Sequence, residues 1–210
     1  MNTNDLILFV KKISNYENGI VITIKNFTNT FTFKSYFELK QACDLWCSNR
    51  DECIIKYGHI SYWDVSEITN MSYLFSDKQF NDDISRWDVS KVKDMCHMFS
   101  DTINFNKSLN DWNVRNVTNM SYMFNGCFMF NKPLDKWKIS NVKFMEGIFC
   151  DALAFNQPLN NWDVSNVKSL INLFLGAIDF NQPLDKWNVS NVRDMEFMFC
   201  GAISFNQNLN

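Results

Sequence analysis

The chain has 210 residues, of which 46% are hydrophobic and 20% charged, a balance that can bury a core and excludes a disordered or collagen-like chain. Lys and Arg number 20 against 23 Asp and Glu, so the net charge of -3 offers no general attraction to nucleic acid or anionic lipid. The usage is lopsided, with 20 Phe, 7 Trp and 29 Asn, and such a bias indicates a repeated motif.

The amino terminus does not have the pattern of a secretory signal. Residues 6–10 form an apolar run of only five residues, which follows Asp5 rather than a basic segment and is too short for a signal peptide. No run approaches the roughly 20 apolar residues of a membrane span. Seven Cys form an odd set in a chain that needs no disulfides for stability, which favours reduced thiols. We therefore expect an intracellular protein without a membrane span.

The first 59 residues do not repeat and are predicted to be an N-terminal cap. Alternation over 19–25 and 30–33 predicts a β-hairpin around residues 26–29. Apolar spacing predicts a helix over 35–48, and a shorter helical turn is expected over 51–57, ended by Gly58. The residues expected on the inner side of the longer helix are Phe37, Leu39, Ala42, Leu45 and Trp46.

Residues 60–210 repeat with a period of 25. The Trp residues that mark the period are Trp63, Trp87, Trp112, Trp137, Trp162 and Trp187. A Phe-Asn pair keeps the same step, and its Asn residues are Asn81, Asn106, Asn131, Asn156, Asn181 and Asn206. We predict six repeats, the last incomplete, in which these Trp and Asn residues form a structural ladder through stacked units.

Within a repeat the hydrophobic spacing changes. Trp162 and Val164 alternate around Asp163, which predicts a short strand. Ser165 then stands where a helix N-cap would, and apolar residues follow at steps of three and four over 167–177, which predicts a short helix. The expected fold is an α/β repeat solenoid, with a short parallel β-sheet on one face, short helices on the other and a hairpin-helix cap.

The order L-x-x-W-x-V followed by V-x-x-M-x-x-M-F-x-x-A resembles a leucine-rich repeat with Trp in one strand Leu position. More closely, it resembles the BspA-like repeats of mycoplasma surface lipoproteins and of amoeba-infecting giant DNA viruses. The resemblance covers 60–210, and 36–66 is similar to the lead-in of such arrays. It implies a right-handed leucine-rich-repeat-like stack and a binding surface rather than a catalyst. The Asn, Lys, Ile and Phe bias and the expected lack of export favour a giant-virus member, located in host cytoplasm or in the virion.

The candidate binding site is the predicted strand face, where the residues on either side of each Trp vary. These residues are Tyr62, Asp64, Arg86, Asp88, Asp111, Asn113, Lys136, Lys138, Asn161, Asp163, Lys186 and Asn188. They form a mixed polar surface that is acidic at its start and more basic around the fourth repeat, and an exposed Tyr among charges suits protein binding. A solvated face with no partner explains any single residue equally well.

Other candidates are weaker. Cys43, Cys47, Cys53 and His59 could be imagined as a metal site, but their spacing favours small buried hydrophobes. The repeated Ser residues fit caps better than nucleophiles, so no enzyme, metal or cofactor is expected. A column of Tyr73, His97, Tyr122, Gly147, Asn172 and Phe197, with Phe144 nearby, could either dock a partner or pack between repeats.

The sequence ends two residues before a further Trp would fall, and we expect this bare last repeat to permit self-association or capping by a partner. The predicted function is non-catalytic binding of a protein, possibly of the host, through the repeat surface. The alternative is a structural or surface component of a viral particle.

Overall fold

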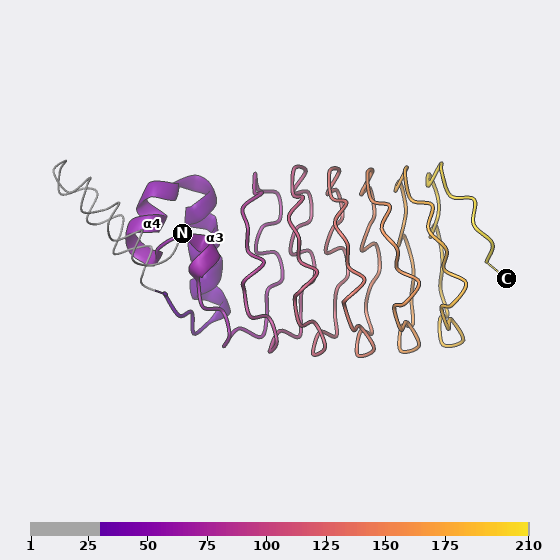
Figure 1. Cartoon of the computed structure of the whole chain (residues 1–210), viewed down its shortest axis with the longest axis horizontal. Coiled ribbons are helices and arrows are strands. Elements are labelled where there is room, and N and C mark those ends of the chain that lie inside the picture. The colour runs from indigo at the N-terminus through magenta and orange to yellow at the C-terminus, as the bar shows by residue number, and fades with distance from the viewer. Residues whose placement is uncertain (1–29, 210) are drawn as a thin grey trace, which may run out of the picture.

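The computed structural model describes residues 30–209, which form a short helical segment followed by a row of stacked coils (Figure 1). Helix α3 (Tyr36–Ser48), helix α4 (Arg50–Tyr57) and the 3-10 helix η1 (Ile60–Tyr62) come first. The coils then follow one another in chain order along the long axis (Figure 1). Each coil is one repeat and is numbered by its Trp, from coil 1 at Trp63 to coil 6 at Trp187.

The two helices predicted for the N-terminal segment are confirmed as α3 and α4. Ser35 caps α3, because its hydroxyl accepts the backbone N–H of Glu38 at 3.2 Å. Gly58, with a φ of 75°, ends α4 in a conformation that favours glycine. The buried residues of α3 are Leu39, Ala42, Cys43 and Trp46. Phe37, expected on the inner side, is 68% exposed.

The predicted hairpin lies mostly outside the described residues. Of its described part, 30–33, Phe33 donates its backbone N–H to Asp64 O at 2.9 Å, and Asp64 donates its N–H to Phe31 O at the same distance. These bonds form a parallel bridge with coil 1. The segment before α3 therefore pairs with the first coil.

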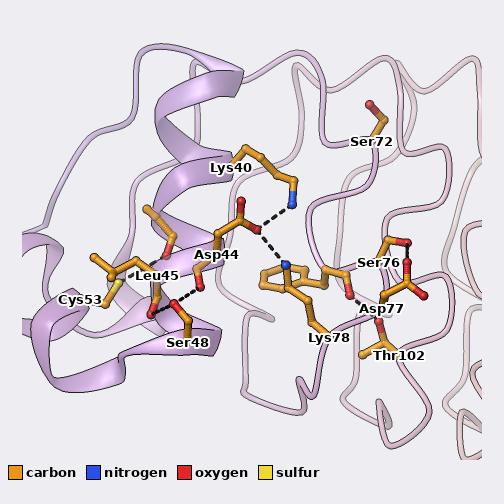
Figure 2. Close-up of polar contacts among 12 residues, drawn as sticks. Lys40, Asp44, Leu45, Ser48, Cys53, Ser72, Ser76, Asp77, Lys78 and Thr102 are labelled. Carbon is orange, nitrogen blue, oxygen red and sulfur yellow. Dashed lines mark hydrogen bonds and ion pairs between the residues drawn. The ribbon is translucent and has the colours of Figure 1, made fainter.

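Charged side chains join the helices to the first coils. Asp44 on α3 accepts Lys40 Nζ at 2.7 Å and Lys78 Nζ, from the end of coil 1, at 2.9 Å (Figure 2). Asp82 of coil 2 accepts Trp46 Nε1 at 2.9 Å and an Arg50 guanidinium nitrogen at 2.6 Å. The carboxylates thus hold the helical segment in a fixed position against the stack.

Inside a coil the backbone runs through successive turns. In coil 5, Trp162 donates its N–H to Leu159 O and Val167 donates its N–H to Val164 O, each at 2.9 Å. Two turns therefore bracket the segment that was predicted to be a strand, and it is too short to pair with its neighbours. No named strand occurs among residues 30–209, where pairing beyond the helices is limited to isolated parallel bridges.

The segment predicted to be a helix carries the bonds between coils instead. Alternate N–H groups of coil 5 donate to carbonyls of coil 6: Leu170 to Asp194, Asn172 to Glu196, Phe174 to Met198 and Gly176 to Cys200, at 2.8 to 3.0 Å. The N–H groups of Leu173, Leu175 and Ala177 bond three residues back within the coil. Asn172 and Gly176 have φ values of 56° and 67°, which an α-helix does not contain.

The expected α/β solenoid with a parallel sheet and a helix in each repeat is therefore wrong. In the described chain the helices are confined to 36–62, and the repeats are built from turns. The physical reason is that turns of three residues place every third or fourth side chain inward, as a helix does. Left-handed residues then return the chain to an extended direction, so each coil can bond to the next.

The interior is filled by aromatic columns. Phe124, Phe149 and Phe174 lie 5.9 and 5.8 Å apart between ring centroids, with nearly parallel planes. Trp137 and Trp162 stack at 6.3 Å. These rings are at most 2% exposed, so burying them removes a large apolar area from water. Because no single coil can cover its own rings, stability comes from stacking neighbours.

Among the described residues, no helix has the length and apolar character needed to cross a membrane.

Candidate partner-binding face

The candidate site is the surface on either side of the buried Trp residues, which we call the Trp-flanking face. It consists of Tyr62, Asp64, Arg86, Asp88, Asp111, Asn113, Lys136, Lys138, Asn161, Asp163, Lys186 and Asn188. All except Asp64, which is half-buried, are exposed, whereas the Trp residues between them are buried. The face is therefore formed by turns and is not the strand face that the sequence predicts.

The buried indoles fix the spacing of the residues on the Trp-flanking face. Trp162 Nε1 donates to Leu134 O of the preceding coil at 3.2 Å, and Trp137 Nε1 donates to Leu109 O at 2.9 Å. The same bond recurs at every Trp from coil 2 to coil 6. Since each indole is held by packing and by a hydrogen bond, the side chains beside it project from a rigid support.

Charge on the face varies along the stack. At its start, Asp64 accepts Thr32 Oγ1 at 2.9 Å, and the Arg86 guanidinium lies 5.5 Å from the centre of the Tyr62 ring. In the middle, Lys136 Nζ contacts Asp111 Oδ1 at 2.7 Å, and this ion pair raises the pKa of Lys136. The start of the face thus combines an acidic, an aromatic and a basic group, and its middle combines Lys136 and Lys138 with one carboxylate, Asp111.

Aspartates on the face also shape the backbone. Asp163 Oδ1 accepts the backbone N–H of Ser165 at 3.1 Å. Hydrogen bonds from the Ser165 hydroxyl and N–H hold the pKa of Asp163 below its usual range, so the residue is ionised at neutral pH. Such an Asx turn fixes the chain directly after the Trp.

The Phe-Asn pairs form a ladder of amide bonds. From Asn106 on, each Asn backbone N–H donates to the side-chain Oδ1 of the Asn one coil earlier, at 3.0 to 3.1 Å, so five bonds join Asn81, Asn106, Asn131, Asn156, Asn181 and Asn206. Gln157, Gln182 and Gln207 add a second donor to three of these oxygens. These amides link the coils, and the Oδ1 atoms of Asn81, Asn106, Asn131, Asn156 and Asn181 are engaged as acceptors.

Sequence reasoning missed a second amide ladder. Asn116, Asn141, Asn166 and Asn191 donate their Nδ2 to the carbonyls of Ser90, Arg115, Ser140 and Ser165 in the preceding coil, at 2.6 to 2.8 Å. The recurring Ser-Asn-Val triplets and the related Arg115-Asn116-Val117 triplet were the available signal. This ladder runs beside the Trp-flanking face and stiffens it.

An aromatic column lies on the hydrogen-bonded side of the stack. Tyr73, His97 and Tyr122 stack with ring centroids 4.7 and 4.9 Å apart. All three have positive φ, and the Tyr122 ring covers Gly147 of coil 4. The rings therefore pack between coils, while Phe144 and Phe197 are 52% and 57% exposed.

Two cysteines of the helical segment, Cys43 and Cys53, are buried in its core, and Cys47 is half-buried. Cys53 Sγ donates to Ala42 O at 3.4 Å, and burial raises the pKa of Cys53 to about 12. Burial likewise raises the pKa of Cys43 and Cys47. Residues 30–209 contain no group of three or more His, Cys, Asp or Glu that could hold a metal ion. Protonated, buried thiols are poor metal ligands and poor nucleophiles.

An apolar depression of about 180 Å³ lies on coils 5 and 6. Trp187, Met195, Met198, Phe199 and Leu209 are among its lining residues. Self-association through this end of the described chain stays a prediction.

The comparisons with known proteins give one match. Residues 47–156 and 132–210 match the model of a family described as "Mycoplasma protein of unknown function, DUF285". No curated protein and no solved structure matches the chain. The match supports the resemblance to mycoplasma repeats and gives no support to a giant-virus origin.

Proposed function

The chain belongs to the DUF285 family of mycoplasma proteins of unknown function, and we propose that it is a non-catalytic scaffold that binds a partner protein through the Trp-flanking face. One observation carries the proposal. The residues beside each Trp are exposed, apart from half-buried Asp64, and differ from coil to coil in charge and size, whereas the Trp and Asn ladders between coils repeat. Variable exposed groups on a repeated support suit recognition of a protein surface.

The chemistry of the face also suits binding better than catalysis. Its charged groups are exposed apart from half-buried Asp64, and burial raises the pKa of Cys53 and of Cys127, which both lie outside the face. A catalytic site needs a base and a nucleophile held together in a cleft. The Tyr62 ring and the Arg86 guanidinium instead form an exposed aromatic-cation pair, a combination enriched where proteins bind one another.

The proposal is tested by comparing two fourfold alanine variants in affinity capture from a cell lysate. The face variant replaces Tyr62, Arg86, Lys136 and Lys186, which are exposed and precede their Trp residues. The control variant replaces Phe128, Lys143, Lys168 and Arg193, which are exposed outside the face and again comprise one aromatic residue and three cations. Both variants are first checked for native circular dichroism.

We expect proteins retained by the parent chain and by the control variant to be lost from the face variant. If the face variant retains the same proteins in the same amounts as the control, binding through this face is refuted. Loss from the control variant alone would likewise refute it and direct attention to the other side of the stack.

A further inference from the structure

Coil 4 lacks a hydrogen bond that the other five coils form on the Trp-flanking face. In five of six coils the residue after Trp is Asp or Asn, and its side-chain oxygen accepts the backbone N–H two residues on. The five bonds join Asp64 to Ser66, Asp88 to Ser90, Asn113 to Arg115, Asp163 to Ser165 and Asn188 to Ser190, at 3.0 to 3.4 Å. Coil 4 has Lys138 there, whose ammonium group cannot accept, so this coil forgoes the Asx turn.

The neighbouring coil departs from the repeat in the same direction. The third residue after Trp is Ser in five coils and Arg115 in coil 3. Neither change improves packing, because Arg115 and Lys138 are both exposed. Two repeat positions in adjacent coils have thus exchanged small polar groups for cations, one of them at the loss of a local hydrogen bond.

Both cations line one depression on the face. It has a volume of about 310 Å³ and is lined by Trp112, Asn113, Val114, Arg115, Lys136 and Lys138, which we call the basic depression. Its lining contains three cations and no carboxylate. Lys136 is paired at the rim with Asp111 at 2.7 Å, whereas Arg115 and Lys138 form no ion pair within residues 30–209.

These groups are suited to a carboxylate. Asn113 Oδ1 already accepts the N–H of Arg115 at 3.4 Å, which leaves the Asn113 amide with its donors. A guanidinium binds a carboxylate through two parallel N–H bonds, and an ammonium adds a third charged donor. Because like charges in one depression repel each other, an anion between Arg115 and Lys138 also relieves that repulsion.

The surroundings limit the length of the anion. At the position of Lys138, coil 2 has Asp88 and coil 5 has Asp163, both exposed carboxylates. A long polyanion lying along the stack, such as a nucleic acid, would meet these charges on both sides of the basic depression. A short acidic segment with one or two carboxylates would not.

We propose that the basic depression binds Glu or Asp side chains of a short acidic segment in the partner protein. This proposal rests on the proposed function, since it assigns the partner's chemistry at one part of the Trp-flanking face. Under this proposal Arg115 and Lys138 select the partner. Tyr62 and Asp64, at the start of the face, contact another part of the partner.

The test uses variants that restore the repeat residues. R115S/K138N gives each coil the group found at the same position elsewhere, so the fold should be kept and the Asx turn of coil 4 regained. The matched control K168T removes an exposed cation outside the Trp-flanking face, in coil 5, and introduces the residue that coil 3 has at the same repeat position, Thr118. The probe is a Gly-Ser peptide with two adjacent Glu at its centre, and its counterpart has Gln at both places.

Binding is followed by NMR of the backbone amides at low and high salt. We expect saturable shifts at Asn113, Arg115 and Lys138 with the Glu peptide only, affinity about tenfold lower in R115S/K138N, unchanged affinity in K168T and weaker binding at high salt. No saturable shift, equal binding of the Gln peptide, or equal affinity in R115S/K138N would overturn the proposal. So would tighter binding of an oligonucleotide at the same residues.

Affinity capture separates this proposal from the proposed function. If R115S/K138N retains the partner that the fourfold face variant loses, the assignment to the basic depression fails while binding through the face stands. If the face variant also retains the partner, both fail.

Discussion

Removing one acceptor from the Asn ladder should weaken the stack by an amount that the structure allows us to work out. Asn131 Oδ1 accepts the Asn156 backbone N–H at 3.1 Å and Gln157 Nε2 at 2.7 Å. N131A deletes the acceptor of both bonds between coils 4 and 5. Each bond contributes about 0.5 to 1.5 kcal/mol, and the half-buried Asn156 N–H loses its partner, so we expect a loss of about 2 kcal/mol.

Two control variants isolate the acceptor. N206A makes the same chemical change at the same repeat position, but no bond to the Asn206 side chain occurs among residues 30–209, so the expected loss is below about 0.5 kcal/mol. N131D keeps a side-chain oxygen in place and should preserve both bonds at a cost near that of N206A.

The assay is urea unfolding at pH 7, followed by far-ultraviolet circular dichroism and by Trp fluorescence. Because repeat arrays can unfold in parts, the midpoints from both probes and the slope of the transition are compared before a free energy is derived. A loss in N131A equal to that in N206A would refute the structural role of the ladder. A loss in N131D as large as that in N131A would show that packing, and not the acceptor, is at stake.

Three further predictions concern buried or half-buried groups. Burial lowers the pKa of His97 below 6.5. The contribution of the neutral His97 ring to stability is therefore complete above about pH 6.5 and is lost as the pH falls through the folded-state pKa. NMR should show the His97 ring titrating at lower pH in the native chain than in urea. Burial raises the pKa of Cys127, so a thiol reagent should label exposed Cys200 in the native chain and Cys127 only after unfolding, and rapid native labelling of Cys127 would contradict its placement. A Cβ on Gly147 would overlap the Tyr122 ring, so G147A should lose about 2 kcal/mol in thermal unfolding, and less in a Y122A background.

The rows of side chains could be predicted from the sequence because the repeat itself determines them. Trp137 and Trp162 occupy the same position one period apart, so any regular stacking brings their rings together, as the 6.3 Å separation shows. The helices α3 and α4 were equally accessible, since Ser35 and Gly58 mark ends that a helix requires. Side-chain register and end signals are properties of the sequence alone.

The backbone path within a coil could not be predicted in this way. Leu170, Leu173 and Phe174 have the spacing of a helix face, and turns of three residues produce the same spacing. The residues that decide between the two are those with positive φ, and most of them, such as Tyr122 and Asn172, are not glycine. Their conformation is imposed by bonds to the next coil, so it is a tertiary effect that local propensity does not contain.

The same distinction explains which part of the candidate site could be found. Lys136 and Lys138 were recognisable as variable residues beside a Trp, because their exposure follows from the register of the ladder. The sequence alone does not single out Arg115, because the Ser residues at the same position in the other coils fit helix caps. Arg115 stands out as a cation at a turn because the backbone N–H groups of Ser90 and Ser165, at the same repeat position, donate to Asp side chains in Asx turns. A residue that departs from the repeat is informative only when the hydrogen bond formed at that position in the other coils is known. The basic depression could therefore be recognised from the structure and not from the sequence.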